Sequence, residues 1–309
     1  MRILITGSSG LVGAELAASL RARGHEVVEY DIARAPADGA VEDIRDPVVL
    51  ADRMQGCDGV FHLAAVSRVA WGERDPDRCH SVNVEGTRRV IEAALAAPAR
   101  PWLIFASSRE VYGDPDILPV TEDAPMIAAN HYGRSKAEGE ALVNAARGQG
   151  LRTAIIRLSN VYGTANDHPD RAVPALLVAA IQGQQLRITG AEVFFDFVHV
   201  ADCVTGMLSA MERLEGGIAD LPPIQLTTGI PTSLRELAQK ASAVAGREAD
   251  IVTLPPRSFD VRGFCGIPAR AGALLDWQAG ISLDEGLARL HRILSAQETA
   301  RNRRYAPPV

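Results

Sequence analysis

The first half of the chain alternates short apolar runs with longer amphipathic segments. The apolar runs predict buried strands at 2–6, 26–31, 59–65, 102–108 and 152–160. Between them, segments such as 11–24 and 83–97 repeat their apolar residues with the period of a helix. Strands that alternate with helices form a parallel sheet covered by helices on both faces. We therefore predict an α/β fold built on a doubly wound parallel sheet.

Beyond residue 163 this alternation becomes less regular. Amphipathic helices are predicted at 233–246 and 282–302, and an apolar run at 194–200 is expected to return to the main sheet. The stretch 253–270 contains many proline and arginine residues and is expected to be too polar for the core. These separate segments predict a smaller, discontinuous α/β lobe. We assign 1–163 plus 194–221 to the larger domain, and 164–193 plus 222–309 to the smaller lobe.

A glycine-rich turn joins the first predicted strand to the first predicted helix. It reads ITGSSGLVG, with glycines at positions 7, 10 and 13. Glycine lets the backbone turn sharply and approach a pyrophosphate, while the helix amino terminus offers free N–H groups and a partial positive charge. This context predicts a dinucleotide site. Its contacts are expected at Gly7, Ser9, Gly10, Leu11, Val12 and Gly13.

An aspartate ends the second predicted strand. The carboxylate of Asp31 can accept hydrogen bonds from both ribose hydroxyls and repel a 2′-phosphate, which favours NAD over NADP. Arg34 is close enough in sequence to weaken that preference. We predict NAD as the cofactor.

Tyr132 and Lys136 are four residues apart in a predicted helix, and residues at that spacing are neighbours on its surface. A tyrosine has an ordinary pKa of about 10 and is a poor base. A nearby ammonium stabilises the phenolate and lowers that pKa. A serine at the end of the preceding strand, Ser107 or Ser108, can bind a substrate oxygen. In the context of the glycine-rich turn, this group predicts an acid–base device beside a hydride acceptor.

Composition excludes several other classes of function. The net charge is −6, from 32 basic and 38 acidic residues, which argues against nucleic acid or acidic membranes as partners. The first motif begins too early to leave room for a signal peptide, and no apolar run reaches the ~18 residues of a membrane span. The four cysteines are isolated and the histidines show no ligand spacing. We expect a cytoplasmic protein with reduced thiols and no metal site.

Several motifs along the chain together resemble one family. GSSGLVG, HLAA (62–65), NVEGT (83–87), SSREVYGDP (107–115), YGRSK (132–136), RLSNVYG (157–163) and DFVHVADC (196–203) occur in the order and spacing of the extended short-chain dehydrogenases/reductases. The chain is similar in particular to their NAD-dependent sugar-nucleotide epimerases and dehydratases, including members like UDP-glucose 4-epimerase. This resemblance covers nearly the whole chain and implies a Rossmann-type domain that binds NAD and a smaller lobe that binds the substrate.

The resemblance also implies roles for individual residues. Tyr132 would be the general base and acid, Lys136 would tune its pKa and anchor the nicotinamide ribose, and Ser108 would bind the sugar hydroxyl. Further cofactor contacts are implied at Asp43, Ile44, Leu63, Ala64, Ala65 and Asn83. Substrate contacts are implied at Ser108, Glu110, Asn160 and Arg257, the last two on the diphosphate.

The implied chemistry starts when Tyr132 removes the proton of a sugar hydroxyl, usually at C4, as a hydride passes to NAD⁺. Return of the hydride to the opposite face of the keto sugar gives an epimer, so we predict a 4-epimerase of a UDP-hexose-like nucleotide sugar with tightly retained NAD. The alternatives are a 4-keto-sugar-nucleotide reductase or dehydrogenase, a 4,6-dehydratase, and a non-enzymatic dinucleotide-sensing scaffold. The family also implies a homodimer that pairs through the Tyr132 helix and its neighbour.

Two positions depart from the family pattern. The 4,6-dehydratases have Thr-Asp-Glu where this chain has Ser108, Arg109 and Glu110, and arginine cannot act as the acid that protonates a leaving hydroxyl. We therefore rank dehydratase below epimerase, and expect Arg109 to be exposed or paired with a carboxylate such as Glu110. Phe195 stands where many members have a diphosphate-binding arginine. That loss of a cation puts the substrate's nucleotide in question.

Overall fold

The computed structural model describes residues 1–34, 39, 41–219, 221–255 and 261–304. Its main sheet, within that part of the chain, has six parallel strands in the order β2-β1-β3-β4-β5-β9. They are β1 (Arg2–Thr6), β2 (Glu26–Tyr30), β3 (Gly59–His62), β4 (Trp102–Ser108), β5 (Thr153–Leu158) and β9 (Ile224–Leu226). The strand order reverses between β1 and β3. In sheets of this kind, ligands bind at that point, beside the carboxyl ends of the strands.

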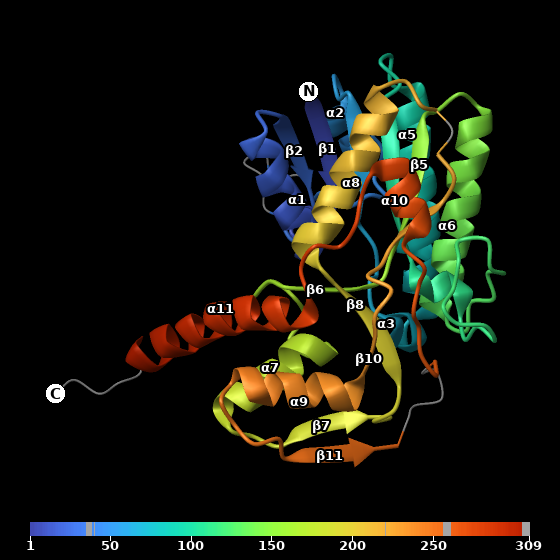
Figure 1. Cartoon of the computed structure of the whole chain (residues 1–309). Helices are drawn as coiled ribbons and strands as arrows, with labels where there is room; N and C mark the ends of the chain where they lie inside the picture. Colours follow the sequence, from blue (N-terminus) through green and yellow to red (C-terminus); the bar gives the residue numbers. More distant parts are fainter. Residues whose placement is uncertain (35–38, 40, 220, 256–260, 305–309) are drawn as a thin grey trace.

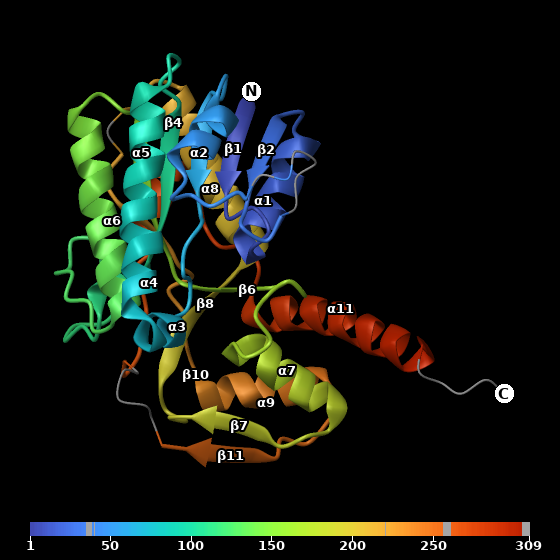
Figure 2. The ribbon, with the colours of Figure 1, turned by 180° about the vertical axis from the view of Figure 1, so that it is seen from behind.

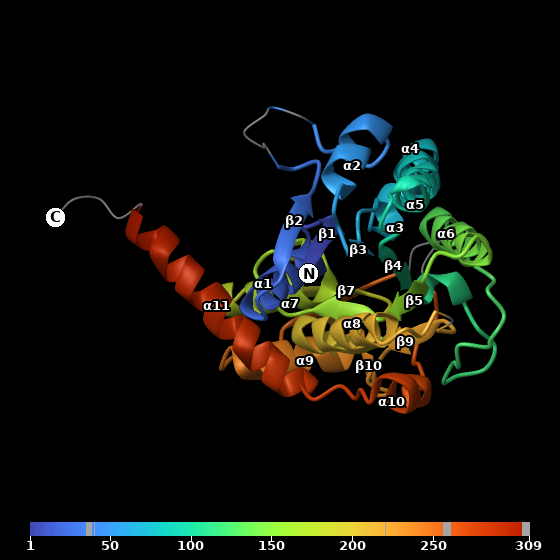
Figure 3. The same cartoon turned by 90° about the horizontal axis from the view of Figure 1, so that it is seen from above.

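Both faces of the main sheet are buried. Along β1, Ile3 and Ile5 pack into one apolar core and Leu4 packs into the other, because successive side chains of a strand point to opposite faces. The first core is covered by α1 (Leu11–Ala22), α8 (Val200–Glu215) and α10 (Ala269–Leu275); the second is covered by α2 (Pro47–Met54), α5 (Gly86–Ala96) and α6 (His131–Gly148). Figure 3 shows the two groups on opposite sides of the strands. The predicted Rossmann-type α/β fold is confirmed.

A second lobe lies beyond the carboxyl ends of the main strands (Figures 1 and 2). Its third apolar core joins α7 (Ala172–Gln182), α9 (Leu234–Val244) and α11 (Leu283–Arg304) to a parallel pair of strands, β7 (Leu186–Thr189) and β11 (Ile251–Leu254). The N-cap of α9 is Ser233, which forms a capping box with Glu236: each side chain accepts a hydrogen bond from the other residue's backbone N–H. The far end of α11 extends away from both lobes toward the C-terminus (Figure 1).

A small three-stranded sheet connects the two lobes, in the order β10-β8-β6. It consists of β6 (Asn160–Tyr162), β8 (Phe194–His199) and β10 (Pro231–Ser233). The prediction that residues 194–200 return to the main sheet is therefore wrong. The edge of β5 is already paired with β9, with Ile156 opposite Ile224, so β8 pairs with β6 instead. Asp196 of β8 is buried and accepts hydrogen bonds from Thr228 and Gly229, which ties β8 to the segment before β10.

Parts of the C-terminal half also pack with the larger domain. Strand β9 extends the main sheet, and Ala271 and Leu275 of α10 join the core beneath α8. The sequence predicts that the stretch 253–270 is too polar for the core, but two of its described residues, Phe264 and Cys265, are buried. The division into lobes stays a proposal, and these contacts favour placing β9 and α10 with the larger domain.

Candidate active site

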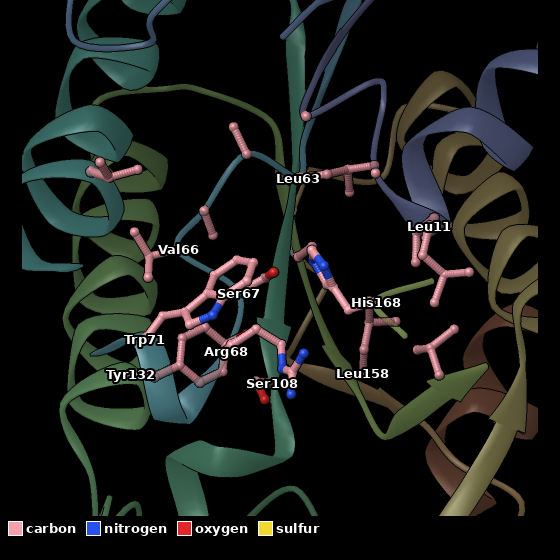
Figure 4. Close-up of a pocket in the computed structure, with 18 of the residues that line it drawn as sticks. Leu11, Leu63, Val66, Ser67, Arg68, Trp71, Ser108, Tyr132, Leu158 and His168 are labelled. Carbon is pink, nitrogen blue, oxygen red and sulfur yellow. The ribbon is translucent and has the colours of Figure 1, made fainter. Parts of the chain in front are cut away.

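A cleft of about 1050 Å³ opens at the carboxyl ends of the main strands, next to the reversal between β1 and β3. We call one part of the cleft its arm: it is lined by the glycine-rich turn and the segment after β2. We call the other part its inner end: it is lined by the segment after β4 and the start of α6. Figure 4 shows Tyr132, Ser108 and Trp71 near one another, with Leu11 at the start of α1 on the opposite side of the view. The cleft thus joins most of the positions that the sequence selects.

The glycine-rich turn is shaped by close backbone approaches. Gly7 has φ +74°, and a Cβ there would lie 2.7 Å from the backbone nitrogen of Ala64. A Cβ on Gly13 would lie 2.1 Å from the carbonyl oxygen of Gly7, so the first turn of α1 packs directly on the loop. Gly10, the N-cap of α1, provides no side-chain cap. The first N–H groups of α1 therefore have no capping side chain and can bind a pyrophosphate.

The carboxylate of Asp31 lies beside this turn. It accepts hydrogen bonds from the backbone N–H groups of Ser9 (2.9 Å) and Ala33 (2.9 Å). Arg34 makes ion pairs with Glu29 and with Glu42 (3.6 Å), so its charge is already partnered. The structure therefore weakens the argument that Arg34 favours a 2′-phosphate. Asp31 remains free to receive ribose hydroxyls on its open side.

The outer end of this arm is formed by Asp43 and Ile44, which both line the cleft. Hydrogen bonds from the Arg45 guanidinium hold the pKa of Asp43 below its ordinary value, so its carboxylate is charged at neutral pH. The carbonyl of Asp43 accepts a hydrogen bond from the Tyr30 hydroxyl (2.8 Å), which fixes the backbone there. Leu63, Ala64 and Ala65 also line the cleft, and the backbone of Leu63 and Ala64 lies against Gly7 of the glycine-rich turn. The residues present therefore fit a dinucleotide.

Asn83, an implied cofactor contact, lies behind the wall of the cleft. It is buried in a π-helical turn (Ser81–Glu85) and is not among the residues that line the cleft. Its side chain accepts from the N–H of Val66 (2.7 Å) and donates to the Ser135 hydroxyl (2.9 Å). Because its amide is engaged inside the protein, Asn83 holds the segment after β3 against α6. Its implied contact with the cofactor stays a prediction, and its observed role is to support a segment that lines the cleft.

The two serines that end β4 have different partners. Ser107 donates a hydrogen bond to the buried carboxylate of Glu140 (2.5 Å). Ser108 accepts from the backbone N–H of Glu110 (3.2 Å). Burial raises the pKa of Tyr132, and a hydrogen bond with the Ser108 side chain partly opposes that rise. Of the two serines left open by the residue pattern, Ser108 is therefore the one in contact with Tyr132.

Tyr132 and Lys136 lie on one face of α6, and both are buried. The amino nitrogen of Lys136 lies 5.9 Å from the centroid of the Tyr132 ring, and it donates to the Ala106 carbonyl at 2.8 Å. The predicted lowering of the Tyr132 pKa is wrong for the charges of the chain itself: burial raises the pKa of Tyr132 to about 12. Burial also lowers the pKa of Lys136 to about 8. Burial favours the neutral form of each group and is the largest cause of both pKa shifts.

Arg109 and Asn160 meet at the inner end of the cleft. Arg109 is buried and pairs with Glu110 (2.6 Å), as one of the two sequence alternatives proposes. Its Nε also donates to Asn160 Oδ1 (2.6 Å), and its guanidinium carbon lies 4.5 Å from the centroid of the Phe195 ring. All four residues line the cleft. The predicted diphosphate contact Arg257 lies outside the described residues.

Sequence reasoning missed a set of side chains that cross the cleft. Arg68, in the segment after β3, pairs with Asp170 before α7 (2.5 Å). Next to that pair, the rings of Trp71, in α3 (Val69–Arg74), and His168 meet edge to face, with centroids 4.7 Å apart. These contacts join the larger domain to the second lobe. Their position after the carboxyl end of β3 is the signal that could have selected them, since such segments face the ligand.

Comparisons with known proteins agree with this geometry. A profile of the NAD dependent epimerase/dehydratase family matches residues 3–220. The UDP-glucose 4-epimerase of Mycolicibacterium smegmatis is 32% identical, covering 94% of this chain and 97% of that protein. The UDP-glucuronic acid decarboxylase 1 of Danio rerio is 27% identical, covering 99% of this chain and 76% of that protein. Its similarity shows that related sequences have different activities.

The solved structures similar to this chain include MoeE5 in complex with UDP-glucuronic acid and NAD. The TM-score is 0.86 at 27% identity, covering 96% of this chain and 100% of that chain. The prediction of NAD as the cofactor is confirmed. In the part of the chain that the structure describes, no helix is both long and apolar enough to cross a membrane.

Proposed function

Because the chain belongs to the NAD dependent epimerase/dehydratase family, we propose that it is a 4-epimerase of a nucleotide-activated sugar, such as a UDP-hexose. The observation that carries the proposal is the convergence of Ser108, Tyr132 and Lys136 at the inner end of a cleft whose arm fits NAD. Relatives named UDP-glucose 4-epimerase at 32% and 30% identity support it.

The chain supplies binding groups and a proton carrier. Ser108 and Tyr132 are in hydrogen-bonding contact, so one sugar hydroxyl can reach both oxygens, and Tyr132 can take its proton. NAD⁺, when bound, supplies the hydride acceptor and a positive ring. Since the chain alone leaves the pKa of Tyr132 at about 12, further positive charge beside the phenol is needed for it to act as a base at neutral pH.

Lys136 can hold the ribose while it supports Tyr132. An ammonium has three donors, and one of them is directed at the Ala106 carbonyl. The others can bind ribose hydroxyls. The Ala106 contact fixes Lys136 to the end of β4, next to Ser108, so a single rigid strand positions two of the three groups.

The test is turnover of UDP-, dTDP-, GDP- and CDP-sugars, followed by NMR for inversion at C4. Tyr132→Phe should lower kcat at least about 100-fold, because it removes the proton carrier. Tyr162→Phe is the matched control: its hydroxyl is buried without a hydrogen-bond partner among the described residues, and it does not line the cleft. Unchanged turnover in Tyr132→Phe would show that the assigned proton carrier is wrong.

The same samples separate an epimerase from a reductase or dehydrogenase. An epimerase regenerates its NAD in each cycle, so purified protein should retain the dinucleotide and show no net change in absorbance at 340 nm during turnover. A reductase would consume reduced cofactor in proportion to product. Stoichiometric consumption would reject the epimerase in favour of that alternative.

A further inference from the structure

Arg109 is a cation enclosed by aromatic rings at the inner end of the cleft. Its guanidinium carbon lies 4.5 Å from the centroid of Phe195 and 5.7 Å from that of Phe264. The residue is 8% exposed, and it belongs to the residues that line the cleft. A charge held between apolar rings interacts strongly with whatever polar group reaches it, because water does not screen it there.

The hydrogen bonds of this guanidinium are incomplete. Nε donates to Asn160 and Nη2 to Glu110, each at 2.6 Å. Nη1 is buried and has no hydrogen-bond partner among the described residues. Leaving a buried charged donor unpaired is costly, and the great majority of such groups in proteins are satisfied. The free donor therefore indicates that a ligand oxygen completes the set.

The position of Arg109 limits which part of a substrate it can reach. Arg109 directly follows Ser108, which under the proposed function binds the reacting sugar hydroxyl together with Tyr132, so the Arg109 side chain begins one residue away from that hydroxyl. A group on a neighbouring sugar carbon is therefore within reach. Both oxygens of Glu110 already accept hydrogen bonds, from Arg109 and from Asn130 (2.8 Å), which offsets its repulsion of a second anion.

We propose that Arg109 binds a carboxylate on the sugar, next to the reacting carbon, so that the preferred substrates are nucleoside-diphosphate hexuronates and not neutral hexoses. A carboxylate accepts a charge-assisted hydrogen bond, which is stronger than the bond from the same donor to a neutral hydroxyl. The aromatic walls around the guanidinium increase that difference, because they exclude water. The inference rests on the proposed function and specifies its substrate class.

The test compares UDP-glucuronate with UDP-glucose, which share the nucleotide and diphosphate and differ in the charge at C6. Wild-type enzyme should show a kcat/KM at least about tenfold higher for UDP-glucuronate. Arg109→Gln should reduce that ratio about 10- to 100-fold, mainly through KM for the uronate. The control is Arg262→Gln, which also removes an arginine paired with a carboxylate, Asp114, but outside the lining of the cleft.

Each outcome decides the inference. A wild-type preference for UDP-glucose would overturn it. An equal loss of kcat/KM for both substrates in Arg109→Gln would also overturn it, because an equal loss indicates a diphosphate contact or a structural role. The wild-type comparison needs no variant, so it decides the matter even if Arg109→Gln does not fold. If neither UDP-sugar is epimerised, the proposed function is decided separately, by the screen of the other nucleotide sugars, and this inference is decided by binding. Calorimetry on NAD-loaded protein then decides: tighter binding of UDP-glucuronate supports the inference, and equal or weaker binding rejects it.

Discussion

Replacing Lys136 by methionine should stabilise the protein at neutral pH while it removes activity. Lys136 is 3% exposed, and its amino group donates to the Ala106 carbonyl. Burial lowers the pKa of Lys136 from 10.5 to about 8, so folding forces a charged group into a place that favours its neutral form. Methionine has a similar length and carries no charge, so it removes this cost.

The magnitude follows from the pKa change. The difference of about 2.5 units between 10.5 and 8 corresponds to about 3 kcal/mol at neutral pH, at 1.36 kcal/mol per unit. The lost hydrogen bond to Ala106 opposes this by about 1 kcal/mol. We therefore expect the free energy of unfolding to rise by about 2 kcal/mol at pH 7.

The sign of the pH dependence is a separate test. The folded-state pKa of Lys136 lies below its unfolded value, so between pH 8 and 10.5 the unfolded chain binds more protons and the wild-type protein gains stability as pH rises. The penalty is complete below pH 8 and absent above 10.5. The advantage of Lys136→Met should therefore be largest at pH 7, and near pH 10.5 it should give way to a deficit of up to about 1 kcal/mol from the lost hydrogen bond to Ala106.

The assay is urea unfolding of dinucleotide-free protein at pH 7 and pH 10.5, followed by circular dichroism. Lys240→Met is the matched control, because Lys240 is partly exposed and paired with Asp284 (2.7 Å). Its removal should change stability by less than about 1 kcal/mol. If Lys136→Met is less stable than wild type at pH 7, or if its gain persists at pH 10.5, then the buried charge does not oppose folding as argued.

Two further predictions concern the dinucleotide. Gly13→Ala places a Cβ 2.1 Å from the Gly7 carbonyl oxygen, so it should lower the free energy of unfolding by about 1–3 kcal/mol and weaken NAD binding more than tenfold. The control is Gly148→Ala, whose Cβ has no atom within 4 Å and which should be neutral or slightly stabilising; urea unfolding measures the stability of both variants and calorimetry measures their NAD binding. Asp31→Asn should weaken NAD binding and reduce the discrimination against NADP, since it removes the charge beside the ribose site; an unchanged NAD-to-NADP affinity ratio in calorimetry would place the ribose elsewhere.

The elements that carry the dinucleotide site are predictable because their signals are local. A strand, a glycine-rich turn and a helix follow one another within residues 2–22, and Asp31 comes directly after the next strand. Residues of one helix face, such as Tyr132 and Lys136, are neighbours by spacing alone. Helical and strand periods hold wherever such segments are placed, so the order of elements and the parallel sheet also follow from the pattern of apolar residues.

The contacts between segments that are distant in sequence, and the positions of charged groups from those segments, depended on the fold. Segment 194–200 reads as a strand, but whether it joined the main sheet depended on β9 occupying the edge of β5. The sequence shows the absence of a cation at Phe195, while the structure shows the guanidinium of Arg109 packed on that ring from another segment.

The sequence by itself determined the fold class, the dinucleotide turn and the pairing of Tyr132 with Lys136, because each depends on neighbours along the chain. Only the tertiary structure decided that Ser108 is the serine in contact with Tyr132, that Asn83 is engaged inside the protein, and that the pKa of Tyr132 is raised. The physical reason is burial. How far water is excluded from a side chain depends on segments that are distant in sequence, and that exclusion sets both its pKa and its available partners.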